Sequence, residues 1–361
     1  MREVLPTSLF AGMLLLFMVG LLFVSRAEET ADSIAQTTMV TQSHSIPEIT
    51  SRSDLAEMIR AAKAGDTIEL PAREFGYLKL TGIHFAEPVI IKGVKGASFS
   101  KITLRDVRNL HLQNITVRAG TTSNHLSDFA VTIMRSHGIK ISDSNISWSD
   151  DGDWGNDGTG MTARLSTDVV IEGTVFHNSF TGLVVRDAGN VSVHKNIFRD
   201  LRRDGINVSG TVGIDIDQNV CTDFHPERPR DHPDCIQFWN DTAIQSNENV
   251  RITANKIIRG EGGVSQGIFL AGQKPGLPHR NVLIEGNLIQ QGMGQGIFLR
   301  KVENAVVRNN IVRAAPPVEH TLVITLRAPL KDIRVEGNKA ARIDVAPEIP
   351  ASEVLLFNND P

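Results

Sequence analysis

The chain has 361 residues, a formal net charge of −4, 22% charged residues and 41% hydrophobic residues. This composition predicts one large folded domain or two ordinary ones, and it excludes a disordered chain. No long basic run is present, so the charge pattern indicates no nucleic-acid partner.

The first 27 residues stand apart from the rest of the chain. Arg2 precedes an apolar run from Leu9 to Val24, and Ser25-Arg26-Ala27 places small residues at the spacing of a cleavage site. Residues 1–27 are therefore expected to be a secretory signal peptide that is cut after Ala27. An uncleaved membrane anchor is the alternative, because the run is only slightly shorter than a bilayer span.

Either outcome places the rest of the chain outside the cytoplasm, secreted or periplasmic, with membrane contact only if the segment is uncleaved. Residues 28–48 are polar and predict a loose linker. The folded domain is then expected over residues 49–361.

A single helix is expected, over residues 53–64 (SDLAEMIRAAKA). Ser53 can cap its start, and Gly65 follows its end. Its apolar side chains fall on one face: Leu55, Met58, Ile59 and Ala62. Such a helix would cover the open end of the structure that follows and block edge pairing there.

A repeated pattern of alternating apolar residues, a polar pair and a further apolar residue follows. Clear copies are VSVHKNIF (191–198), IDIDQNVC (214–221), VRITANKI (250–257), VLIEGNLI (282–289), AVVRNNIV (305–312) and IRVEGNKA (333–340). The Asn residues at 196, 219, 255, 287, 310 and 338 are 23, 36, 32, 23 and 28 residues apart. A minimum near 23 with variable insertions indicates a solenoid of stacked coils.

A second short strand is expected after each Asn strand. Its copies are GMTA (160–163), GLVV (182–185), GINV (205–208), CIQF (235–238), GIFL (267–270) and GIFL (296–299). Two or three short strands per coil predict a parallel β-helix, an all-β fold with a continuous apolar core. The Asn residues are expected to form a ladder at a tight bend, in left-handed backbone geometry.

The helix, the AGDTIEL entry (64–70) and the coils resemble the right-handed parallel β-helix superfamily of pectate-lyase-like proteins. The resemblance covers roughly residues 50–345 and implies the fold. It implies little about chemistry, because that superfamily includes lyases, hydrolases, epimerases and adhesins.

Insertions interrupt the coils between the Asn position and the second strand. The longest are SWSDDGDWGNDGTG (147–160) and TDFHPERPRDHPD (222–234), with a moderate one at 258–266. All of them fall at the same corner, so they are expected to project on one side of the solenoid, where functional loops concentrate.

The candidate site is a column of residues that come just before the second strand. Asp204 and Asp234 lie on neighbouring coils, roughly 5 Å apart, with Gln266 and Gln295 after them and Thr159 and Thr181 before. Two carboxyl groups at that distance perturb each other, and one stays protonated. This is the requirement for an acid and base pair, although an Asp at a strand start also commonly caps a turn.

Further candidates surround this pair. His232 and Arg203 are assigned catalytic roles with the two Asp residues. Expected substrate contacts are Asn207 and Gln237 on the outer face, flat rings at Trp154 and Trp239, Arg230, and Gln266. Arg202 and Arg228 flank them. Each residue alone has a local structural explanation, and only their combination indicates a site.

Two features stay open at this point. Cys221 and Cys235 could form a disulfide at the base of the insertion, or they could be two small buried side chains. The acidic loop 149–157 could hold Ca²⁺, but its Asp spacing does not match an ordered calcium loop, so no metal site is assigned.

Two resemblances compete for the chemistry. RRDGINV (202–208) and PDCIQF (233–238) loosely resemble the paired Asp strands of polygalacturonase-type hydrolases, but Gln266 stands where that family has the His of a Gly-His-Gly motif. Uronate lyases and C5-epimerases on this fold remove a proton next to a sugar carboxylate. His232 or Asp234 would be the base, and Arg203 or Arg230 would neutralise the carboxylate.

The leading hypothesis is an exported enzyme that acts on an acidic, uronate-containing polysaccharide by lyase or C5-epimerase chemistry. The alternatives are an inverting hydrolase of polygalacturonase type and a non-catalytic carbohydrate-binding surface protein. No cofactor is expected, apart from the Ca²⁺ alternative above.

Overall fold

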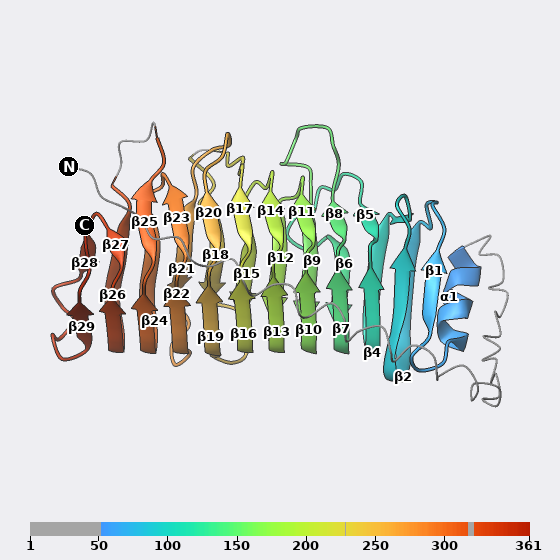
Figure 1. Ribbon diagram of the computed structural model, residues 1–361, viewed down its shortest axis with the longest axis horizontal. Helices are drawn as coiled ribbons and strands as arrows, with labels where there is room; N and C mark the ends of the chain where they lie inside the picture. Colours follow the sequence, from blue (N-terminus) through green and yellow to red (C-terminus); the bar gives the residue numbers. More distant parts are fainter. Residues whose placement is uncertain (1–51, 228, 317–320) are drawn as a thin grey trace, which may run out of the picture. The chain divides into compact units, whose positions relative to one another are not determined.

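The computed structural model describes residues 52–227, 229–316 and 321–361 (Figure 1). The chain divides into two units, Met1–Glu48 and Ile49–Pro361, and every described residue belongs to the second. The expected signal peptide, the linker and Arg228 lie outside the described residues. No helix in the described part of the chain is long and apolar enough to cross a membrane.

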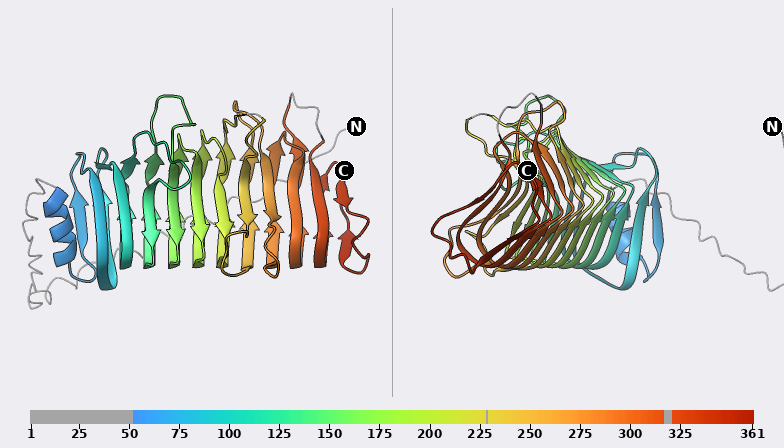
Figure 2. Two further views of the ribbon diagram at one scale, coloured as in Figure 1. Left: turned by 180° about the vertical axis from the view of Figure 1, so that it is seen from behind. Right: turned by 60° about the vertical axis from the view of Figure 1, so that its left-hand side comes forward.

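The unit is a parallel β-helix in which each coil contributes three strands (Figures 1 and 2). All pairings between named strands are parallel, as stacking of successive coils requires. Two of the three faces join in a sheet of 19 strands, and the third is a sheet of ten. The predicted fold class is confirmed.

Three strand series form the faces. The first carries the candidate site: β6 (Phe129–Met134), β9 (Thr159–Arg164), β12 (Thr181–Arg186), β15 (Ile206–Ser209), β18 (Asp234–Trp239) and β21 (Gln266–Ala271). The second is β7 (His137–Ser142), β10 (Thr167–Glu172), β13 (Gly189–His194), β16 (Val212–Asp217), β19 (Asn247–Thr253) and β22 (His279–Glu285). The long strands β2 (Tyr77–Gly93), β4 (Lys101–Gln113), β24 (Gln295–Arg308) and β26 (Val323–Glu336) run through both series.

The third series is the ten-stranded sheet. It contains β3 (Ser98–Phe99), β5 (Thr116–Arg118), β8 (Asn145–Ser147), β11 (Val175–His177), β14 (Ile197–Arg199), β17 (Val220–Thr222), β20 (Lys256–Ile258), β23 (Leu288–Gln291), β25 (Ile311–Ala314) and β27 (Lys339–Ala340). The unit begins with β1 (Thr67–Leu70) and ends with β28 (Ile343–Val345) and β29 (Val354–Phe357).

Alternation along each strand builds a single core. Ile206 and Val208 of β15 are buried and face in, and Asn207 between them faces out. The same alternation holds Ile236 and Phe238 in the core from β18. Because register between coils is exact at these positions, like side chains stack along the axis, as Phe176 and Phe198 do at 4.8 Å.

The Asn ladder forms at the bend between the second and third series. Asn219 is 2% exposed, and the Oδ1 of Asn255 accepts both its backbone N–H and its side-chain amide, at 2.9 and 3.0 Å. Its Nδ2 also donates to the carbonyl of Val193 at 2.8 Å. These bonds satisfy backbone groups that the bend would leave unpaired.

The expected left-handed geometry of the Asn residues is wrong. The residue before each Asn takes positive φ instead, as at Lys195 (53°), Gln218 (55°) and Ala254 (53°). The Asn position supplies the buried side-chain amide, and the exposed residue before it takes the left-handed turn of the bend.

The two ends of the unit differ. Helix α1 (Arg52–Ala61) begins one residue before the expected cap and ends three residues before the expected end. Leu55 and Ile59 are fully buried over the first coil, so the covering role of this helix is confirmed. At the other end no described element covers β29, and Leu356 remains 48% exposed at a position that faces the core in the preceding coil.

Candidate functional site

The insertions project from one corner of the unit, as the right-hand view of Figure 2 shows. Two of them touch. The indole ring of Trp154, from the first insertion, stacks on the ring of His225 from the second, at 3.8 Å between centroids and 8° between planes. The expected clustering of the loops is therefore confirmed, although one face of Trp154 is already covered.

Cys221 and Cys235 form a disulfide. Their Cα atoms are 5.9 Å apart, and the bond closes a segment with a sequence separation of 14. Cys235 takes the position that Gly182 and Gly205 occupy in the two preceding coils, where a side chain would point toward the third strand series. The insertion is thus tied at its base to the core.

Asp204 and Asp234 lie side by side on neighbouring coils. The N–H of Gly205 donates to the carbonyl of Asp234 at 3.0 Å, and Ile206 pairs in register with Ile236. The next coil continues the column with Gln266, which pairs with Asp234. The predicted adjacency of the two carboxyl groups is confirmed, one ladder spacing of about 4.8 Å apart.

Both carboxyl groups bind side-chain amides of the outer face, but they are covered. Each residue is only 2% exposed, which differs from the open working surface that the sequence suggested. Pro233 and Asp231, just before Asp234, are also buried. The insertion that was expected to border the pair also shields it from water.

A chain of amide groups connects the pair. Nδ2 of Asn207 donates to Oδ2 of Asp204 at 3.0 Å and to Oε1 of Gln237 at 2.6 Å. Nε2 of Gln237 then donates to Oδ2 of Asp234 at 2.7 Å. Asn207 and Gln237 face outward as expected, but their amides already bind the two carboxyl groups.

The four carboxyl oxygens are not equivalent. Oδ1 of Asp204 accepts the backbone N–H of Asp234 at 3.2 Å, so both oxygens of Asp204 have donors. Oδ1 of Asp234 is buried and has no partner among the described residues. Burying a negative charge at an oxygen without a donor is costlier than burying a neutral carboxyl group, so this environment favours the protonated form of Asp234.

Burial raises the pKa of both carboxyl groups. The pKa of Asp204 is raised by burial and held down in part by Arg203 and by the amide of Asn207. The pKa of Asp234 is raised well above its usual value, first by burial and then by the negative charge of Asp204. The ionised form is therefore disfavoured more strongly at Asp234, because the charge of Asp204 adds to the effect of burial.

Two neighbouring arginines support this arrangement in different ways. The positive charge of Arg203 lowers the pKa of both carboxyl groups, so it lies close enough to stabilise their ionised forms. Arg202 instead binds the insertion, with Nε on Asp231 at 2.8 Å and an ion pair to Glu227 at 2.6 Å. Both guanidinium groups lie over the ring of Phe180, at 5.3 and 5.7 Å.

Other predicted residues are not brought onto the pair. His232 is exposed on the insertion, and no described contact joins it to either carboxyl group. Arg230 has a side chain that is 73% exposed and pairs with Glu227 at 3.2 Å. Their assigned roles therefore stay predictions without support from contacts in the described residues.

The outer face also carries an aromatic row that the sequence reading missed. Phe269 and Phe298 occupy the positions equivalent to Gln237 on the next two coils, and their rings stack at 4.4 Å and 7°. Trp239 lies 6.3 Å from Phe269. The repeated GIFL motif carried this signal, because its Phe stands between two inward residues.

A row of arginines was also missed. It follows the last position of the first series, which Trp239 and Ala271 occupy in the middle coils. Its members pair in register in two groups: Arg164 with Arg186, and Arg300 with Arg327. Among the described residues no carboxylate pairs with Arg164 or Arg300, whereas Arg186 lies 3.5 Å from Asp187 and Arg327 2.8 Å from Asp344.

The side chains of the acidic loop 149–157 form hydrogen bonds within the loop. The carboxyl group of Asp157 accepts the hydroxyl and the N–H of Ser149 at 2.7 and 3.0 Å, and burial raises its pKa to about 6. Asp151 accepts the backbone N–H of Asp153 and the amide of Asn156. Within residues 52–227, 229–316 and 321–361, no group of three or more His, Cys, Asp or Glu side chains converges as metal ligands would.

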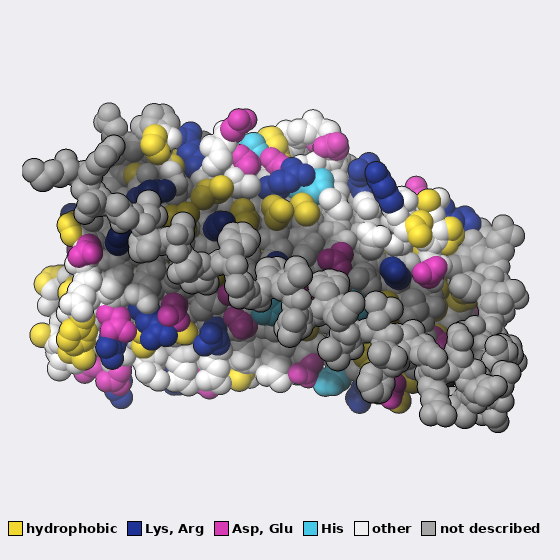
Figure 3. Space-filling view, viewed as in Figure 1, with side chains coloured by type: hydrophobic (Ala, Val, Ile, Leu, Met, Phe, Trp, Pro, Cys, Tyr) yellow, Lys and Arg dark blue, Asp and Glu magenta, His cyan; other side chains and the backbone are white. Residues whose placement is uncertain are grey.

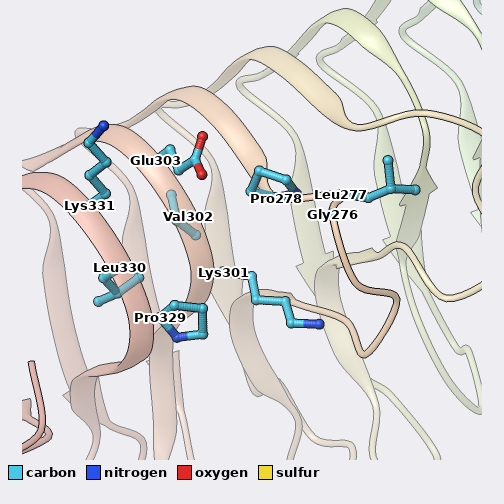
Figure 4. A pocket seen from close by; sticks show the side chains of 9 residues that line it. All are labelled: Gly276, Leu277, Pro278, Lys301, Val302, Glu303, Pro329, Leu330 and Lys331. Carbon is cyan, nitrogen blue, oxygen red and sulfur yellow. The ribbon is translucent and has the colours of Figure 1, made fainter.

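A cavity of about 220 Å³ lies elsewhere, between the loop after β21 and the bends of β24 and β26 (Figure 4). Leu277, Pro329 and Leu330 give it a mainly apolar lining, with Lys301 and Lys331 at its edge. It contains neither carboxyl group. The surface view shows acidic, basic and His side chains together at its top, where Figure 1 draws the loops (Figure 3).

Solved structures of similar fold come from several kinds of protein. The surface protein and adhesin PfbA of Streptococcus pneumoniae matches with a TM-score of 0.53 and 10% identity, over 86% of this chain and 93% of that chain. A family 28 exopolygalacturonase of Yersinia enterocolitica matches with 0.50 and 9%, over 85% and 74%. At such identities the likeness concerns the fold alone.

A tailspike protein of the E. coli bacteriophage HK620 matches with a TM-score of 0.55 and 13% identity, over 85% of this chain and 61% of that chain. No curated protein matches the sequence significantly. The family model described as the right-handed β-helix region matches residues 89–224 and 132–339, which together span most of the solenoid. The chain belongs to the right-handed β-helix family.

Proposed function

We propose that this protein acts on an acidic polysaccharide, with Asp234 as proton donor and Asp204 as its ionised partner. One observation carries the proposal: two carboxyl groups lie on neighbouring coils, and burial and mutual repulsion raise the pKa of Asp234 well above normal. A pair with one proton can donate it at one atom and accept one at another.

The arginine row supports an acidic substrate. From Arg164 on β9 to Arg327 on β26 it covers six coil steps, or about 29 Å. A polymer that lies along the solenoid axis would meet these cations on one side and the acid pair on the other. Phe269 and Phe298 stand at strand positions between those of the arginines and the acids, and Trp239 stands at the arginine position of its own coil. The three rings offer apolar contact to sugar rings.

Elimination or C5-epimerisation fits these groups. The carboxylate of Asp204 takes the C5 proton of a uronate, while Arg203 stabilises the charge that develops on the sugar carboxylate. In elimination the C4–O bond then breaks, a C4–C5 double bond forms, and Asp234 protonates the leaving oxygen. Both carboxyl groups are 2% exposed, so the covering side chains must shift when the polymer binds.

Hydrolysis is the second candidate, because the same pair could protonate a glycosidic oxygen and activate water. A structure of the HK620 tailspike holds a pentasaccharide, which supports a carbohydrate ligand on this fold. The disulfide of Cys221 and Cys235 supports an extracellular or periplasmic location, where such bonds persist.

The test uses the purified protein with alginate, pectate and neutral polymers. New ultraviolet absorbance reports elimination, new reducing ends without absorbance report hydrolysis, and NMR of the product reports epimerisation. Asp234→Asn and Asp204→Asn should each reduce kcat by about 10²–10⁴-fold. The control Asp332→Asn makes the same change at an exposed bend and should keep full activity.

Retention on an acidic polymer without any product would instead support the non-catalytic binding protein. Full activity in both pair variants would show that the acid pair is not the site. Binding that requires about six or more sugars and weakens with salt would support contact between the polymer and the whole arginine row.

A further inference from the structure

The two outward amides next to the acid pair have a specific geometry. Asn207 donates to Asp204 and also to Gln237, and Gln237 donates to Asp234. Each carboxyl group therefore receives one side-chain amide N–H, in both cases on its Oδ2.

The two carboxyl groups differ in the number of hydrogen-bond donors that they receive. Asp204 receives one amide donor and the backbone N–H of Asp234, one on each oxygen. Asp234 receives one donor, on Oδ2, and its Oδ1 has no partner in the described residues. Two donors stabilise a carboxylate more than one does.

We propose that Asn207 and Gln237 are positioning residues with separate roles. Asn207, together with the backbone N–H of Asp234, keeps Asp204 ionised, and Gln237 occupies Oδ2 of Asp234 so that the single proton of the pair lies on Oδ1. The effect of this arrangement on catalysis rests on the proposed function. The placement of the proton does not, because it can be measured without substrate. The two amides are assigned to the carboxyl groups rather than to the substrate.

Few other titratable groups lie near the pair and could decide which carboxyl group holds the proton. Arg203 lowers the pKa of both carboxyl groups, and Asp231 from the insertion raises that of Asp204. The coil before presents Thr181, and the coil after presents Gln266, neither of which titrates. The contact that distinguishes the two acids is therefore the backbone N–H of Asp234 on Oδ1 of Asp204, since each acid receives one amide N–H.

This placement of the proton suits an acid and base reaction at the pair. Oδ2 of Asp234 already accepts the amide of Gln237, so a proton on Oδ1 is the one that stays available for a leaving oxygen once the covering side chains have shifted. Ionised Asp204 is then ready to accept a proton in the same step. Reversing the two states would leave the backbone N–H of Asp234 and the amide of Asn207 donating to a neutral acid.

The test measures the titration of each carboxyl group in the intact protein labelled with ¹³C at the Asp carboxyl carbons. Asp204→Asn and Asp234→Asn assign the two signals. In the unsubstituted protein the Asp234 signal should titrate at higher pH than the Asp204 signal. The reverse order would overturn the proposal.

Substitution of Asn207 and of Gln237 should each change the titration of the carboxyl group to which that amide donates. Asn207→Leu removes a donor from Asp204, so the Asp204 signal should move to higher pH, toward that of Asp234. Gln237→Leu should move the Asp234 signal to still higher pH. The matched control Gln295→Leu, two coils beyond Asp234, should leave both signals unchanged, and unchanged signals in the first two variants would contradict the proposal.

Activity separates this inference from the proposed function. The alkaline limb of the kcat profile should move up in Gln237→Leu, and the acid limb should move up in Asn207→Leu. Circular dichroism checks that the variants fold. The expected titrations without turnover of any polymer would refute only the function, whereas turnover with unmoved limbs would refute only the positioning role.

Discussion

At the scale of single residues, the fold holds several polar side chains away from water and assigns each a defined partner. His279 is fully buried; its Nε2–H donates to the carbonyl of Ala271 at 2.8 Å, and its Nδ1 accepts the amide of Asn247 at 3.0 Å. Both bonds require a neutral ring. Burial accordingly lowers its pKa to about 4.

This histidine predicts a loss of stability in acid. The unfolded chain takes up the proton near pH 6.5, whereas the folded protein resists it until about pH 4. Stability is therefore complete above pH 6.5 and falls as the pH drops toward 4, by up to about 3 kcal/mol. Chemical denaturation at pH 7.5 and 4.5 should show this fall in the unsubstituted protein.

The matched variant is His279→Gln, which keeps a polar side chain without a titrating ring. It should be less stable at pH 7.5 but should lose less stability between the two pH values. An equal loss in both proteins would mean that other groups cause the acid dependence.

At the scale of elements, the insertion between β17 and β18 is held at three points. The disulfide ties its base, Arg202 binds Asp231 and Glu227, and the ring of His225 stacks on Trp154. A loop of this length without strands would otherwise have considerable freedom. The three contacts keep it over the acid pair.

The disulfide predicts a measurable contribution to stability. Cys221→Ala combined with Cys235→Ala removes a closed loop with a separation of 14 residues, which should lower the free energy of unfolding by about 3 kcal/mol. Guanidinium denaturation with and without reductant measures it. Reductant should destabilise the unsubstituted protein by a similar amount and leave the double variant unchanged; no effect of reductant on either would contradict the prediction.

At the scale of the whole unit, the coils stack so that each contacts its neighbours only. Stability in such a solenoid is a sum of local terms, and an end needs a cap. Helix α1 provides it at the first coil, with Leu55 and Ile59 fully buried. The acid pair lies many coils away, on β15 and β18.

Damage to the cap should therefore stay local. Leu55→Ala combined with Ile59→Ala should cost about 2–5 kcal/mol for each side chain in the end coil. Hydrogen exchange should show lost protection in β1 and β2 and normal protection in β18. The exposed Glu57→Ala serves as control, and lost protection at β18 as well would show that the unit unfolds as one.

Much of the architecture could be predicted because its signals are local and repeated. The Asn positions and the second strands identified the coils, and the register of Ile206 with Ile236 follows from that count. The pairing of Asp204 with Asp234 was predictable for the same reason. The αL assignment of the Asn residues failed because a buried ladder and a positive φ occur at adjacent positions of the same bend.

The sequence by itself determined the solenoid, its cap and the neighbourhood of the two acids, since periodicity sets which residues share a face. Only the tertiary structure decided that the acids are covered, that Asn207 and Gln237 bind them, and that four arginines form a row. The reason is physical: coil lengths vary, so residues 22 to 36 positions apart become neighbours, and their contacts depend on how each insertion folds back.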